Sequence, residues 1–108
     1  MVVDHDRLFH ALADGTRRDI LRRAARGEHS VSALARSYDM SVTAVQKHVS
    51  VLQRAGLIEK RRRGREQIVC VQPASLAAAR EALDELEAIW RGRVDRMDHI
   101  LQDPERTP

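Results

Sequence analysis

Five polar residues near the middle of the chain recur at helical spacing. One face of a helix with 3.6 residues per turn carries Thr43, Gln46, Lys47, Ser50 and Arg54. Their hydroxyl, amide and charged groups can hydrogen-bond to the exposed edges of DNA bases. Gln46 suits adenine, Lys47 suits guanine or phosphate, and Thr43 suits a base edge or a thymine methyl group. The alternative interpretation is an ordinary solvated helix face.

A run of arginines follows this stretch and surrounds a glycine. Arg61, Arg62, Arg63 and Arg65 flank Gly64. Guanidinium groups bind phosphates through two parallel hydrogen bonds, so this run suits a nucleic-acid backbone or minor groove better than a structural role. Charged residues also protect exposed strand edges from aggregation, which leaves a solubilising hairpin as the alternative.

A helix and a hairpin must position these two groups. Ser41 is a good N-cap for the helix, and Gly56 ends it. Its predicted buried face repeats at intervals of three and four residues, at Val42, Val45, Val49 and Leu52. After Gly56, short apolar runs on either side of Gly64 predict two strands joined by a turn. Pro73 ends the second strand.

Four further helices are predicted around them. Asp4 and Asp14 can cap the first two, Ser32 a short third, and Ser75 the last. In the last helix an apolar residue recurs every seven positions, at Leu76, Leu83, Trp90 and Met97. The fold class expected is mainly α with a small β-hairpin. Two short helices followed by a basic hairpin indicate a winged helix-turn-helix, with about five helices and a two-stranded wing.

Length and charge agree with a single nucleic-acid-binding domain. We expect residues 1–102 to form a DNA-binding and dimerisation domain and residues 103–108 to be a flexible tail. The net charge is +3, but residues 41–72 hold seven basic and two acidic residues. Aromatic residues make up only 3%, too few for the stacking platforms of single-strand binders. Double-stranded DNA is therefore the expected partner.

Other classes of protein lack their characteristic residues in this sequence. We find no glycine-rich phosphate loop and no nucleophile paired with a base, so we expect no enzyme and no cofactor. Cys70 is the one cysteine; it excludes an internal disulfide framework and is expected to pack as a small buried hydrophobe. The sequence shows no long apolar run and no secretory signal, which predicts a cytoplasmic protein without a membrane partner.

Three segments resemble the ArsR (arsenic repressor) family of bacterial winged-helix regulators. Residues 8–18 are similar to that family's opening motif, and residues 41–48 to its recognition helix. Residues 51–58, which lead into the arginine-rich hairpin, are the most specific match. The recognition-helix set expected to bind DNA comprises Ser41, Thr43, Ala44, Gln46, Lys47, His48, Ser50 and Arg54.

The resemblance implies a homodimer that binds an imperfect palindrome near a promoter and represses transcription. It also implies that the first and last helices of the chain form the dimer interface, through Leu8, Phe9, Leu83, Leu86, Trp90, Val94 and Met97. The apolar stripe of the last helix independently requires a partner surface, although packing within one chain is the alternative.

Metal and redox sensing are less well supported. The arsenic sensors of that family carry a cysteine pair in the third helix, where residues 31–36 hold no thiol. The zinc sensors use paired ligands in the last helix, where this chain has only Asp95, Asp98 and His99. We therefore expect no metal site. An unidentified small-molecule effector, a redox response through Cys70 and a protein-interaction module that keeps the fold stay open as alternatives.

Overall fold

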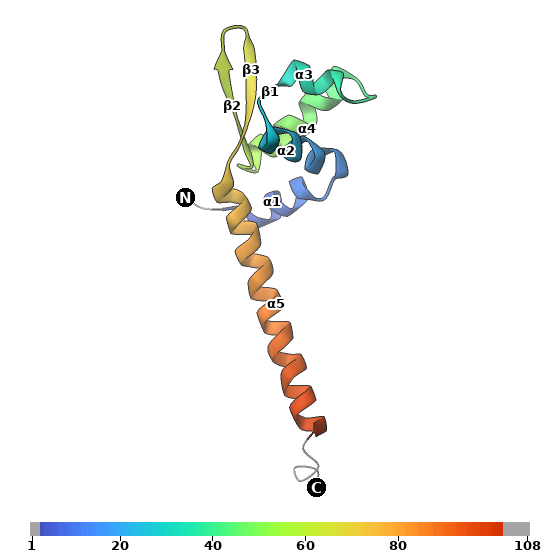
Figure 1. Ribbon diagram of the computed structural model, residues 1–108, viewed down its shortest axis with the longest axis vertical. Coiled ribbons are helices and arrows are strands. Elements are labelled where there is room, and N and C mark those ends of the chain that lie inside the picture. The colour runs from blue at the N-terminus through green and yellow to red at the C-terminus, as the bar shows by residue number, and fades with distance from the viewer. Residues whose placement is uncertain (1–2, 103–108) are drawn as a thin grey trace.

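The computed structural model describes residues 3–102, so the tail expected at residues 103–108 lies outside the described residues. The elements are α1 (His5–Leu12), α2 (Gly15–Arg26), β1 (His29–Ser30), α3 (Val31–Arg36), α4 (Val42–Arg54), β2 (Ile58–Arg63), β3 (Glu66–Val71) and α5 (Pro73–Gln102). Helices α1–α4 form a body, from which the β2–β3 hairpin projects at one end and α5 at the other (Figure 1). The predicted fold class, five helices with a basic hairpin, is confirmed.

Side-chain caps fix where the helices begin. Side-chain oxygens of Asp4, Asp14 and Ser41 accept hydrogen bonds from backbone amides three residues later, at 3.1, 3.0 and 3.1 Å, as predicted. The predicted cap of α3 was wrong, because Ser30 and not Ser32 caps it, through a 3.0 Å bond from the Ala33 amide.

The basic hairpin belongs to a three-stranded antiparallel sheet. Strands β2 and β3 pair with Arg62 opposite Gln67, and Gly64 adopts the left-handed φ of 63° that the tight turn between them favours. A third strand, β1, pairs with β3 through Ser30 and Ile68, which gives the order β1-β3-β2. Two residues are too few to show strand periodicity, so the sequence did not reveal β1. We call the β2–β3 hairpin, residues 58–71, the wing.

The core lies where α1–α4 meet the base of the wing. Its fully buried side chains include Leu8, Ile20, Leu34, Val45, Val49, Leu52 and Leu57. Two predictions change as a result. Leu8 is 0% exposed inside a single chain, so it cannot contact a partner as predicted. Val42, predicted on the buried face of α4, is 56% exposed because it lies in the first turn, before the helix reaches the core.

Helix α5 begins at Pro73, two residues before the predicted Ser75, and changes character along one face. Where it packs on α1 that face carries small residues, the buried Ala79 and the half-buried Ala78 and Ala82. Farther along it carries large exposed side chains, Leu83, Leu86, Ile89, Trp90, Met97, Ile100 and Leu101. The change occurs where α5 leaves the body (Figure 1). Across residues 3–102, no helix combines the length and apolar character needed to cross a lipid bilayer.

Candidate nucleic-acid interface

Helix α4 presents the predicted polar stripe to solvent. Val45, Val49 and Leu52 are fully buried and anchor one side of the helix against the core. The opposite side exposes Thr43, Gln46, Lys47 and Arg54, with Ser50 half-buried beside them. The predicted placement of this stripe is confirmed. Its side chains can reach into a major groove, which is wide enough to admit an α-helix. We call α4 the recognition helix.

Three other residues of the predicted DNA-binding set are placed differently. The Ser41 side-chain oxygen accepts the Ala44 amide proton, and Ala44 is half-buried. His48 is also half-buried and faces α2, with its Nδ1 3.3 Å from Arg17 Nη1. Because His48 lies on the side of α4 that packs on the body, it is not part of the exposed stripe. The DNA contact expected of His48 stays a prediction.

The arginines of the wing are exposed but differ in what they contact. Arg61 lies 3.6 Å from Glu59, and Arg62 Nε donates to the Gly64 carbonyl oxygen at 3.2 Å. Arg63 pairs with Glu28, in the loop after α2, which raises the pKa of its guanidinium above the ordinary value. Within residues 3–102 neither Arg62 nor Arg65 has an ion-pair partner, and the Arg65 side chain also donates no hydrogen bond. Arg65 is thus the wing arginine with its charge most available to a phosphate, whereas Arg63 also fastens the wing to the body.

A groove separates the recognition helix from the wing. It has a volume of about 360 Å³ and is lined by Val31, Ser32, Gln46, Ser50, Lys60, Arg65, Glu66 and Gln67. Ser32, Lys60 and Gln67 were not among the predicted site residues. Strand alternation could have predicted Lys60. It lies two residues after the buried Ile58, on the same strand face, and therefore points toward the body.

A polar cluster fastens α2 to the turn between α3 and α4. The Tyr38 hydroxyl donates to Asp19 Oδ2 at 2.5 Å, and the Arg23 guanidinium lies 5.2 Å from the centre of the Tyr38 ring. Hydrogen bonds from Tyr38 and Arg23 lower the pKa of Asp19. Burial, together with the bond to Asp19, raises the pKa of Tyr38 to about 12. This cluster holds the turn that leads into the recognition helix, and no local sequence pattern predicts it.

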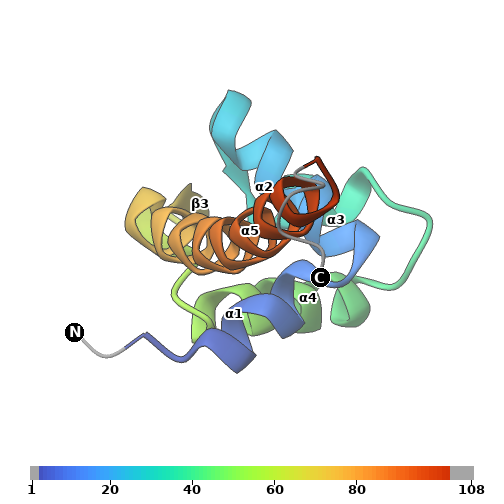
Figure 2. The same cartoon turned by 90° about the horizontal axis from the view of Figure 1, so that it is seen from below.

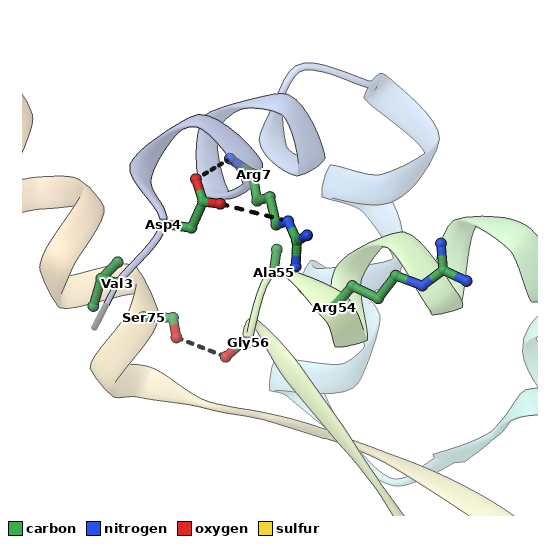
Figure 3. Close-up of a pocket in the computed structure, with 7 residues that line it drawn as sticks. All are labelled: Val3, Asp4, Arg7, Arg54, Ala55, Gly56 and Ser75. Carbon is green, nitrogen blue, oxygen red and sulfur yellow. Dashed lines mark hydrogen bonds and ion pairs between the residues drawn. The ribbon is translucent and has the colours of Figure 1, made fainter. Parts of the chain in front are cut away.

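A small cavity marks the junction of α1, α4 and α5. Val3, Asp4, Arg7, Arg54, Ala55, Gly56 and Ser75 line this space of about 190 Å³ (Figure 3). Arg7 is paired with Asp4 at 3.5 Å, and the Arg54 side chain extends away from Gly56 and Ser75. Arg54 therefore keeps its charge for the polar stripe of α4.

The predicted dimer residues of α5 are accessible. Leu83, Leu86, Trp90 and Met97 are each more than half exposed, while Val94 and Phe9 of α1 are half-buried. Isolated exposed leucines are ordinary, but a continuous row of large apolar side chains along one helix face marks an interaction surface.

Metal-ligating and thiol groups are dispersed. Within residues 3–102 no three His, Cys, Asp or Glu side chains come close enough together to hold a metal ion. Cys70 is half-buried, with its Sγ 3.9 Å from the Ile68 carbonyl oxygen, so it is less enclosed than predicted.

Known proteins share both the sequence pattern and the fold. Residues 12–61 match the family model described as a helix-turn-helix domain. The HTH-type transcriptional regulator Rv2034 of Mycobacterium tuberculosis is 44% identical over 79 residues, which cover 73% of this chain and 74% of the relative. An ArsR-like transcriptional regulator from Rhodococcus superposes with a TM-score of 0.78 at 33% identity, covering 89% of this chain and 91% of that one. The homodimeric winged helix-turn-helix DNA-binding domain Mb0332 of Mycobacterium bovis gives 0.58 at 32% identity, covering 83% and 77%.

Proposed function

Because this chain belongs to the ArsR family of winged helix-turn-helix transcriptional regulators, we propose that it is a homodimeric repressor that binds a palindromic operator in double-stranded DNA. The observation that carries the proposal is the exposed polar stripe of α4 beside a wing that carries four arginines. We assign residues 1–102 to this DNA-binding and dimerisation role. It requires neither catalysis nor a cofactor, and we place it in the cytoplasm.

The recognition helix selects the sequence. Thr43, Gln46 and Lys47 lie in the first half of α4 and are exposed. In the major groove each base pair shows a distinct pattern of donors and acceptors, so an amide that pairs with adenine discriminates by roughly 1–3 kcal/mol. Ser50 and Arg54, farther along the same face, contact the flanking phosphates.

The wing supplies affinity rather than sequence preference. Arg61, Arg62 and Arg65 are exposed on a hairpin that lies across a groove from α4. Each phosphate contact releases counterions when the protein binds. Removing one contact should therefore reduce the slope of log affinity against log salt concentration by about 0.9. Phosphates carry no sequence information, and these arginines therefore set the register of the protein on the duplex.

Two chains associate through α5. The row of exposed apolar side chains that begins at Leu83 leaves a surface that a second copy of the same helix can cover. The similar Mycobacterium bovis domain is described as homodimeric. A two-fold dimer places two recognition helices about 34–36 Å apart, one turn of DNA, which is why the operator is palindromic. Occupancy of an operator that overlaps a promoter excludes the polymerase.

Removing charge from the wing tests this assignment. The double variant Arg62→Gln/Arg65→Gln should bind duplex DNA at least about tenfold more weakly, with a salt slope lower by about 1 to 2. Arg80→Gln/Arg91→Gln is the matched control, since these arginines pair with Asp84 and Glu87 on α5, far from the wing. If the two double variants bind duplex DNA with equal affinity, the result would instead favour a role of this chain as a protein-interaction module.

A further inference from the structure

One arginine side chain connects three helices. Arg17, in the first turn of α2, donates from Nε to the Ala11 carbonyl oxygen at 2.8 Å and from Nη2 to the His10 carbonyl oxygen at 2.9 Å. Its Nη1 lies 3.3 Å from Nδ1 of His48 on the recognition helix. Arg17 thereby satisfies carbonyl groups at the C-terminus of α1 and reaches α4 with the same guanidinium.

A hydrogen bond across this contact requires Nδ1 of His48 to accept, because a guanidinium only donates. Asp14 Oδ2 is 3.8 Å from the same Nδ1, and Asp14 also caps α2 by accepting the Arg17 amide proton. Both groups that face His48 therefore come from the start of α2.

His48 is well placed to set how α4 is rotated about its axis. It follows Lys47, which is exposed, and precedes Val49, which is fully buried. Helix α1 lies alongside α4 and packs on α5 (Figure 2). A shift of α1 would thus reach α4 through the Arg17 side chain.

We propose that Arg17 is a positioning residue, which fixes the recognition helix relative to α1 through its contact with His48 and so determines sequence preference without touching DNA. This inference rests on the proposed function, because it concerns the DNA contacts of the same helix. It also links α1, which packs on the helix assigned to dimerisation, with the helix assigned to recognition.

The adjacent residue provides a matched control. Arg18 Nη1 donates to the Leu12 carbonyl oxygen at 2.8 Å, so it also caps α1, but no contact with α4 is recorded for it in the described part of the chain. A lysine at either position keeps the charge and loses the planar fork. Only Arg17→Lys should therefore alter the recognition helix.

Binding titrations separate positioning from direct contact. The probes are the duplex that the wild-type protein enriches from a random library and a scrambled duplex of equal length, each measured over a series of salt concentrations. Arg17→Lys should bind the enriched duplex about tenfold more weakly, with its salt slope and its affinity for the scrambled duplex unchanged. Arg18→Lys should match the wild type. His48→Leu should reproduce the loss, whereas His48→Asn, which keeps an acceptor near the Nδ1 position, should restore binding.

Three results would overturn the proposal. If Arg17→Lys weakens both duplexes alike and lowers the salt slope by about one, Arg17 contacts a phosphate. If Arg18→Lys loses as much as Arg17→Lys, capping of α1 explains the effect. If His48→Leu binds like the wild type, the Arg17–His48 contact has no role in sequence preference. The two His48 variants keep the bonds from Arg17 to α1, so they test the proposal even if Arg17→Lys does not fold.

A second readout keeps this inference separate from the proposed function. If the wild-type protein enriches no duplex, the DNA-binding assignment fails. The backbone amide resonances of residues 46–50 then test the link alone. They should shift in Arg17→Lys and not in Arg18→Lys, and unchanged resonances in Arg17→Lys would refute it.

Discussion

The Ser75 hydroxyl donates a 2.6 Å hydrogen bond to the carbonyl oxygen of Gly56 (Figure 3). Gly56 follows the last turn of the recognition helix, and Ser75 lies in the first turn of α5. The end of the helix assigned to reading DNA is therefore joined directly to the helix assigned to dimerisation. Together with the Arg17–His48 contact, this bond gives α4 a fixed place relative to both α1 and α5.

The close approach at this junction predicts that Gly56→Ala lowers the free energy of unfolding by more than backbone strain alone would. Gly56 has a φ of 77°, and an added Cβ would lie 3.1 Å from Ser75 Oγ. Gly64 has a similar φ of 63° but open space around it, so Gly64→Ala measures backbone strain alone, about 1–2 kcal/mol. In urea denaturation Gly56→Ala should lower the free energy of unfolding by more than Gly64→Ala does. The difference between the two variants should shrink when Ser75→Ala is added to Gly56→Ala. Equal losses of stability for the two glycine variants would show that Ser75 does not crowd a Cβ at position 56.

The Tyr38–Asp19 bond should make stability depend on pH at both extremes. The pKa of Asp19 is lowered from 3.8, so its contribution is full above that value and is lost as pH falls through the lower, folded value. The pKa of Tyr38 is raised from 10.0 to about 12, so its contribution is full below 10 and is lost as pH rises toward 12.

Tyr38→Phe removes the titration of the tyrosine and the largest of the causes that lower the pKa of Asp19. At neutral pH the variant should be less stable by about 1 kcal/mol, a value kept small because Asp19 is partly exposed to solvent. The difference from the wild type, measured by urea denaturation, should be constant between about pH 5 and 9 and should narrow outside that range. A difference that stays constant into strong acid would show that the contribution of the hydrogen bond does not depend on an ionised Asp19.

Much of this architecture follows from local patterns. The interval of three and four between Val45, Val49 and Leu52 predicts the buried face of α4, and the arginines around Gly64 predict the wing. Both signals arise from neighbours in the sequence, which is why they are readable.

The errors arise where distant segments meet. Leu8 has the apolar character of an interface residue, but it is fully buried in the core of the single chain. His48 has the character of an exposed polar residue, but it is half-buried, and its Nδ1 lies 3.3 Å from Nη1 of Arg17, 31 residues earlier. The start of α3 depends on β1 pairing with β3 across the sheet. No local pattern encodes such contacts, which form only in the folded chain.

Charge on the apolar face of α5 should disrupt association. Leu86 is 64% exposed in one chain, so Leu86→Lys should leave the fold intact and raise the dimer dissociation constant at least about tenfold. Ala88→Lys, on the opposite, polar face, is the control and should stay dimeric. Sedimentation velocity distinguishes the two. Dimers of Leu86→Lys as stable as those of the wild type would place the interface elsewhere.

Gln46 should carry part of the sequence preference. Its side chain is exposed on α4 and lines the groove beside the wing. Gln46→Ala should reduce the ratio of affinities for the preferred and scrambled duplexes by roughly tenfold, with the salt slope unchanged, because a base contact and not a phosphate contact is lost. Random-library selection with the variant provides a second check. An identical selected sequence would show that Gln46 reads no base.

The most direct measurement is a salt-series titration of the wild-type protein on duplex DNA from its own upstream region and on a scrambled duplex of equal length. The exposed stripe of α4 and the arginines of the wing predict tight, sequence-dependent binding that weakens steeply as salt rises. Equally weak binding to both duplexes at every salt concentration would contradict operator binding at that region.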